Sequence, residues 1–143
     1  MPEDRRQDNR QEVTYAKSAQ VPFLYGSMVV VTLGNPREKI WGMVLSLVPE
    51  GLSLNGIELA SFEDFVLLVK AGEALSPAVV FFPMHRIERI ELDLPDGDLP
   101  SLSQRFSAKT GLDAAALLAS IHSKKADEKI GAKASAAAEN DPA

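Results

Sequence analysis

The chain has 143 residues, of which 45% are hydrophobic and 24% are charged, and this composition is typical of one globular domain. Its 15 basic and 20 acidic side chains give a net charge of −5, which argues against general electrostatic binding of nucleic acid or of an anionic membrane. The absence of cysteine excludes disulfides and thiolate chemistry, and no apolar run approaches the ~18 residues of a membrane helix, so we expect a soluble, cytoplasmic protein.

Charge and composition divide the chain into three parts. Residues 1–20 and 124–143 each carry four acidic and four basic side chains and few large apolar ones, so they bury too little surface to offset the entropy of ordering. We expect a disordered N-terminal tail over 1–20 and a disordered, alanine-rich tail over 124–143. The whole net charge of −5 then lies on residues 21–123, which we expect to fold as one domain.

Strand patterns dominate the first half of this domain. Residues 28–33 are rich in β-branched side chains and end at a Gly-Asn-Pro turn, and residues 40–48 form a second strand that we expect to bend at Gly42. Residues 52–59 alternate between apolar and polar side chains, but the alternation changes parity at Asn55-Gly56. This change indicates either a bulge within one bent strand or a two-residue hairpin turn, and we favour the bulge.

The second half of the domain mixes helices with two more strands. Ser61 and Asp64 favour the start of a short helix over 61–71, although Val66 to Val69 also suits a strand. Residues 78–82 predict an apolar strand that ends at Pro83, and residues 86–94 alternate as a last strand. Two further capping-box spacings predict two helices within 101–123, whose apolar faces must pack on the sheet.

The segment 28–93 resembles the Sm/LSm-like small β-barrel family, which includes the bacterial RNA chaperone Hfq. The resemblance rests on the first strand ending at Leu33, on Ile40-Trp41-Gly42 entering a curved second strand, and on the short link from Pro83 to Ile87 between the last two strands. It implies a mainly β protein with added helices: a small Sm-like five-stranded bent β-barrel, a short inserted helix and two C-terminal helices. His85 falls where the chaperone has its histidine.

A second alignment with this family is possible. Residues 61–66 look locally like a run that lies between the second and third strands of the RNA chaperone, which would make 43–49 the first strand. We reject this register because it discards residues 28–33, the strongest strand signal in the chain.

The chain departs from the family where RNA is bound. The RNA-contacting loop of Sm proteins joins the second and third strands and usually offers an aromatic residue or Asn, whereas here the turn is Pro49-Glu50-Gly51, which cannot stack on a base. Within 21–123, seven basic side chains face twelve acidic ones. We therefore expect a non-enzymatic Sm-like interaction or assembly module that self-associates and binds a protein partner. The alternative is an RNA-binding Sm-like protein that uses the link between the last two strands.

The link and the last strand supply the candidate contact residues. If a neighbouring subunit or an RNA is engaged, we expect the contact to involve Pro83, Met84, His85, Arg86 and Arg89, because a short link projects side chains from a rigid frame. The competing interpretation is that Met84 and Ile87 plug the barrel end. The charges of the last strand alternate in sign, which suits either ionic contacts to a neighbour's edge strand or an ordinary solvated face.

The apolar strand at 79–82 bears on the oligomeric state. Its side chains are too apolar to remain exposed at a sheet edge, which predicts a homo-oligomer unless the C-terminal helices cover that edge and keep the protein monomeric.

No catalytic motif, cofactor motif or metal site is visible in the sequence. The chain has no nucleophile elbow, phosphate-binding glycine loop, zinc helix motif or dinucleotide fingerprint, and His85 lacks partner ligands, so we expect no catalytic residue, no cofactor and no metal. We also expect no DNA partner. The aromatic residues Trp41, Phe81 and Phe82 are expected to fill the core rather than to line a pocket.

Overall fold

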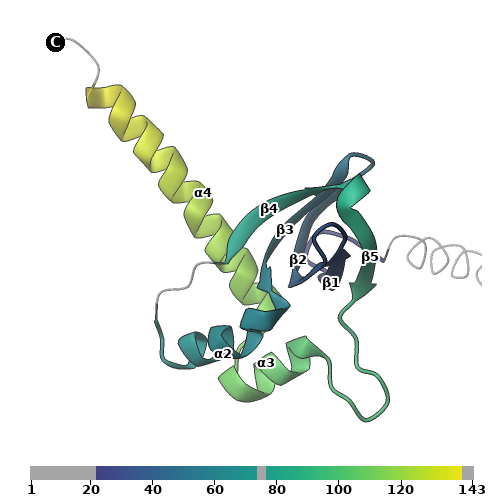
Figure 1. The fold of residues 1–143 in the computed structure, drawn as a ribbon. Coiled ribbons are helices and arrows are strands. Elements are labelled where there is room, and N and C mark those ends of the chain that lie inside the picture. Colours follow the sequence, from purple (N-terminus) through teal and green to yellow (C-terminus); the bar gives the residue numbers. More distant parts are fainter. Residues whose placement is uncertain (1–21, 74–76, 140–143) are drawn as a thin grey trace, which may run out of the picture.

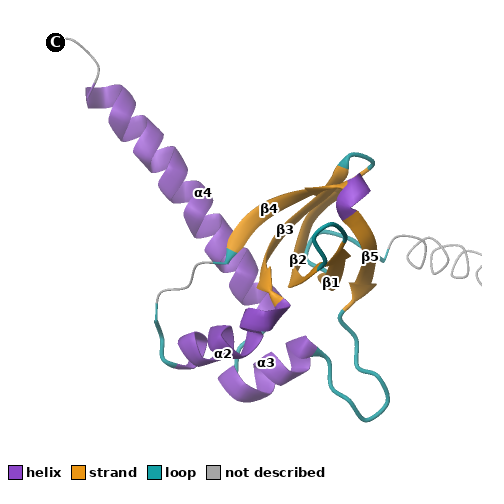
Figure 2. Ribbon diagram, viewed as in Figure 1, coloured by secondary structure: helices purple, strands orange, loops and turns teal. Residues whose placement is uncertain are grey.

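The computed structural model describes residues 22–73 and 77–139 and arranges them as a five-stranded antiparallel sheet with three α-helices (Figures 1 and 2). In chain order the elements are β1 Met28–Leu33, β2 Glu38–Val48, β3 Gly51–Glu58, the 3-10 turn η1 Leu59–Ser61, α2 Phe62–Lys70, β4 Ala78–Pro83, the 3-10 turn η2 Met84–Arg86, β5 Ile87–Leu92, α3 Leu102–Thr110 and α4 Ala114–Glu139. Within the described ranges, no helix is both long and apolar enough to cross a membrane.

The sheet bends strongly but does not close into a barrel. Its strand order is β4-β3-β2-β1-β5, and no ladder joins β4 to β5, so both are edge strands on the two sides of the opening (Figure 2). The five strands, the strong bend and the short link are confirmed, but the sheet stays open and does not form the predicted barrel. The backbone of this link is hydrogen-bonded to two turns of the chain. Met84 N–H donates to the carbonyl of Glu50 (2.9 Å), and Gly34 N–H donates to the carbonyl of Arg86 (2.8 Å).

The pairing of β2 with β3 shows why the apolar pattern of β3 changes parity. The register is unbroken through Asn55, opposite Met43, and Gly56, opposite Gly42, and the irregularity lies instead between Val44 and Ser46. Our predicted bulge at Asn55-Gly56 is therefore wrong, and so is the hairpin alternative, because β3 is one strand. The first part of β3 buries its apolar side chains on one face of the sheet, and its last part does so on the other.

These two faces carry separate cores. The concave face holds a cluster that includes side chains from both edge strands, among them Val80 of β4 and Ile90 of β5. The convex face packs against the helices, and its centre is the fully buried Trp41, whose ring meets those of Phe62 (5.1 Å between centroids) and Phe106 (6.0 Å). Because Met28–Leu33 forms β1 between β2 and β5, the alternative register starting at 43 is excluded.

α3 begins as predicted, but Ser61 makes no side-chain cap at the start of α2, and α4 begins at Ala114 rather than at the capping-box spacing of Thr110 and Asp113 and extends further than predicted. α2 is helical throughout, which resolves the helix–strand ambiguity at Val66, and Ser101 with Gln104 forms the predicted capping box. α4 runs to Glu139, so it covers most of the segment that we predicted as a tail from 124 (Figure 1). Alanine is the best helix former, and this segment is rich in it. The fold class is therefore mixed α/β rather than mainly β. The predicted tail over 1–20 lies outside the described residues.

Asp93 ties the end of β5 to the helical layer. Its carboxylate accepts hydrogen bonds from the indole Nε1–H of Trp41 (3.1 Å), the backbone N–H groups of Leu102 (2.9 Å) and Ser103 (2.7 Å), and the hydroxyl of Ser103 (2.6 Å). A carboxylate in this position satisfies N–H groups of the first turn of α3, which have no partner within the helix. Asp93 therefore fixes α3 against the convex core.

Candidate functional site

The two open edges of the sheet are the first candidate surface. β4 pairs only with β3, and β5 pairs only with β1, within the part of the chain that the structure describes. Each edge thus presents backbone N–H and C=O groups along one side without a neighbouring strand. Exposed edges of this kind pair readily with another chain unless they are covered or charged.

β4 also exposes apolar side chains on the convex face. Val79 is 49% exposed and Phe81 is 53% exposed, and the C-terminal helices leave both uncovered. Phe81 does not belong to the core, so our prediction for it is wrong. Its ring packs over Gly51, where a Cβ atom would lie 2.7 Å from the ring. This arrangement leaves the outer face of the ring open to solvent.

The structure separates the residues predicted for the link into two groups. Pro83 ends β4 opposite Gly51, and Met84 and His85 are exposed on η2, where a partner can reach them. Arg86 instead turns back onto the β1–β2 turn, where Nε donates to the carbonyl of Gly34 (3.3 Å) and a terminal nitrogen donates to that of Pro36 (3.1 Å). Its guanidinium therefore stabilises the chain's own turn.

Arg89 lies on the free edge strand β5 and is exposed. Its guanidinium pairs with Glu91 of the same strand at 2.7 Å. An exposed pair of this kind contributes little to stability, at most about 1 kcal/mol, so both groups can exchange for charges on a neighbouring molecule.

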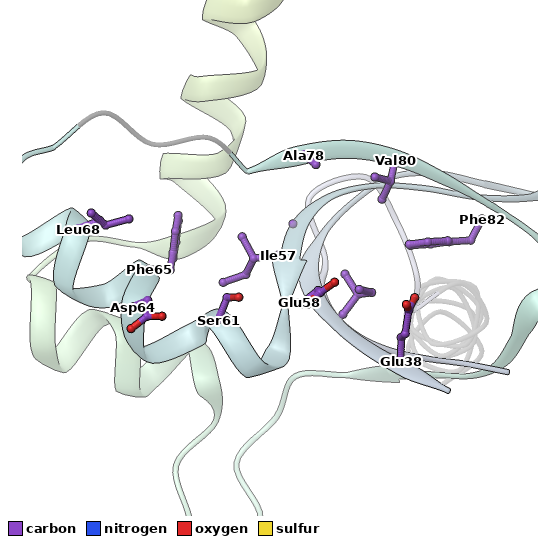
Figure 3. Close-up of a pocket in the computed structure, with 12 residues that line it drawn as sticks. Glu38, Ile57, Glu58, Ser61, Asp64, Phe65, Leu68, Ala78, Val80 and Phe82 are labelled. Atoms are coloured by element: carbon purple, nitrogen blue, oxygen red, sulfur yellow. The ribbon is translucent and has the colours of Figure 1, made fainter. Parts of the chain in front are cut away.

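The second candidate surface is a groove between the sheet and α2, shown in Figure 3. It has a volume of about 730 Å³, which is within the range of ligand-binding clefts. Apolar side chains from β2, β3, α2 and β4 line it, and three carboxylates lie among them: Glu38, Glu58 and Asp64. Sequence reasoning missed this groove because its residues come from four separate segments, with no common motif.

Glu63 and Asp64, neighbours at the start of α2, have different surroundings. Asp64 lines the groove, whereas Glu63 is exposed and pairs with Lys109 (2.9 Å) and Arg105 (2.5 Å) of α3. The hydrogen bond from the Lys109 ammonium, supported by the positive charge of Arg105, holds the pKa of Glu63 below its ordinary value. Glu63 thus joins α2 to α3.

The described residues contain no group of three or more histidine, aspartate or glutamate side chains placed to hold a metal ion. Comparison of the chain with known protein families, with curated proteins and with solved structures finds no match in any of the three.

Proposed function

We propose that the protein is a non-enzymatic, Sm-like assembly module that self-associates by pairing β4 of one copy with β5 of the next. The observation that carries this proposal is the presence of two uncovered edges on one sheet, one of them apolar. An open sheet gains backbone hydrogen bonds when strands are added at its edges, and a head-to-tail contact repeated around an axis closes into a ring.

The side chains of the two edges are suited to each other. On the concave side, Val80 and Phe82 of β4 and Ile90 and Leu92 of β5 are only partly buried, although they pack against the concave core. Pairing β4 with a neighbour's β5 would bring these two sets together and extend that core from one copy to the next. On the convex side, the same contact would cover the exposed ring of Phe81.

The resemblance to Sm proteins points in the same direction, since their barrels form rings through contacts between edge strands. RNA binding has weaker support here. Arg86 is bound to the chain's own turn, so His85 and the exposed Arg89, whose pair with Glu91 is weak, are the predicted contact residues left for a phosphate. The turn at Pro49 to Gly51 has no aromatic side chain of its own, so a base could stack there only on the exposed ring of Phe81, which packs over Gly51.

Light scattering on the purified full chain tests self-association. We expect a mass well above the 15.5 kDa of one chain, and we expect Val79→Lys to shift the mass toward the monomer because a lysine opposes pairing at an edge strand. Leu67→Lys is the control: Leu67 is 64% exposed on α2, away from the sheet edges, and its change should leave the mass unaltered. A monomeric wild-type protein at high concentration contradicts the proposal.

Fluorescence anisotropy with poly-U and poly-A oligonucleotides, each at two salt concentrations, tests the RNA alternative. We expect no binding tighter than micromolar. Tight binding with a steep salt dependence would instead mean that phosphates are contacted by several cations, and it would favour the RNA-binding function over a protein-assembly role.

A further inference from the structure

The groove beside α2 combines an apolar lining with acidic groups. Figure 3 shows Phe65 and Leu68 of α2 at one end, Val80 and Phe82 of β4 at the other, and Ile57 between them. Leu68 is 39% exposed, so apolar surface of the groove is accessible to solvent. Apolar surface of this kind favours an occupant that buries aliphatic or aromatic side chains.

The charged side chains that line the groove itself are acidic, whereas Arg37 and Lys39 border it in an adjoining hollow that shares Glu38 and Glu58. The groove lining includes Glu38, Glu58 and Asp64 and no basic residue. Glu38 has a distant partner, Arg86 at 3.8 Å, whereas Glu58 and Asp64 form no ion pair within the residues that the structure describes. This field attracts a cationic occupant and repels phosphate groups, so it disfavours a nucleic acid.

We propose that this groove binds a cationic, amphipathic segment of a partner protein. Apolar side chains of the segment lie between α2 and β4, and its lysine or arginine residues meet the carboxylates of Glu58 and Asp64. The apolar lining extends across the groove from Leu68 of α2 to Phe82 of β4 (Figure 3). A lining of this extent suits a peptide that inserts several apolar side chains. Val80 and Phe82 also belong to the proposed contact between copies, whereas Glu58, Asp64 and Leu68 line the groove and take no part in that contact.

The probe for a binding test is a fluorescein-labelled peptide of leucine and lysine with helical amphipathic spacing, compared with the same peptide carrying glutamate in place of lysine. We expect the lysine peptide to bind the full chain and the glutamate peptide to bind at least tenfold more weakly. Equal binding of the two peptides would show that charge plays no part and would overturn the proposal.

Two pairs of matched variants locate the binding site. Leu68→Ser should weaken binding about fivefold, whereas Leu67→Ser, its exposed neighbour outside the groove, should have no effect. The double variant E58Q/D64N should weaken binding by a similar factor and flatten its salt dependence. The control E50Q/D98N changes the net charge equally at exposed sites outside the groove and should retain binding. If each control weakens binding as much as its partner, the attraction is non-specific and the groove is not the site.

The groove could instead hold a second copy of the chain or the chain's own N-terminal segment. Each of these occupants predicts a different experimental result, and either result overturns the proposal. If a second copy fills the groove, E58Q/D64N lowers the mass measured by light scattering. If the chain's own N-terminal segment fills it, replacing Arg5, Arg6 and Arg10 by glutamine strengthens probe binding about tenfold. Val79→Lys, which targets the sheet edge outside this groove, should retain probe binding, so failure of self-association and failure of this proposal are distinguishable.

Discussion

At the scale of single residues, the carboxylate of Asp93 joins the convex core to the start of α3. One carboxylate serves the buried indole of Trp41, the start of α3 and the hydroxyl of Ser103. A hydrogen bond to a charged group contributes about 1.5–3 kcal/mol, and a buried donor left without a partner costs about 1–3 kcal/mol. The side chain of Asp93 is therefore more important for stability than its position at the end of an edge strand suggests.

Replacing Asp93 by alanine should lower the free energy of unfolding by about 2–4 kcal/mol, measured by urea denaturation, because it removes several of these bonds together. Asp98→Ala is the control, since Asp98 is exposed in the following loop and its loss should change stability by about 0.5 kcal/mol or less. Equal effects of the two substitutions would show that Asp93 does not hold α3 to the sheet.

At the scale of elements, α2 and α3 are held together at their surface by Glu63. Lys109→Met should raise the pKa of Glu63 toward its ordinary value of 4.5, because the hydrogen bond from Lys109 is the main cause of the lowering. A pKa lowered by folding adds stability above the ordinary pKa, and this stability is lost as the pH falls through the lowered value. Lys109→Met should therefore make unfolding less sensitive to pH in the acid range.

An NMR titration of the Glu63 carboxyl carbon measures this change. Lys70→Met is the control, because Lys70 lies at the other end of α2 and is not among the causes of the shift. If the pKa of Glu63 is the same in the wild type and in Lys109→Met, the ion pair does not hold the two helices in solution.

The elements also show how far sequence reasoning reaches. β1 was predictable to the residue because an uninterrupted β-branched run ends at a turn, and α3 was predictable from its capping box. The parity change at Asn55 was misinterpreted because alternation assumes one buried face, whereas the helices bury part of the second face of β3 as well. The groove depends on contacts between distant segments, and such contacts leave no local pattern.

The sequence predicted only some of the properties of the link residues, because their other contacts are also made with distant segments of the chain. The position of η2 between β4 and β5 follows from the short spacing around Pro83, and the exposure of His85 follows from the turn. The inward bonds of Arg86 depend on the β1–β2 turn, about fifty residues earlier in the chain. A sequence pattern can place a cation on a link, but it does not show which carbonyl groups face it.

At the scale of the whole molecule, the helices bury the convex face of the sheet and add no strand to its edges. The helices cover the convex face over β2 and β3, and α4 then extends away from the sheet (Figure 1). No described element pairs with the outer side of β4 or β5, and α4 reaches only the residue before β4, where the Lys125 ammonium donates to the carbonyl of Pro77 (2.8 Å). The molecule thus has a well-packed centre and two edge strands that are each paired on one side only, within the residues that the structure describes, and our assembly proposal uses this arrangement.

Amide hydrogen exchange at a low and a high protein concentration tests edge pairing most directly. If copies associate as proposed, amides of β4 (78–82) and β5 (87–92) should gain protection at high concentration, while those of α2 (62–70) should not change, because only the edge strands acquire new backbone partners. Protection that is independent of concentration, or that increases on α2 or α4 and not on the two edge strands, would contradict the account.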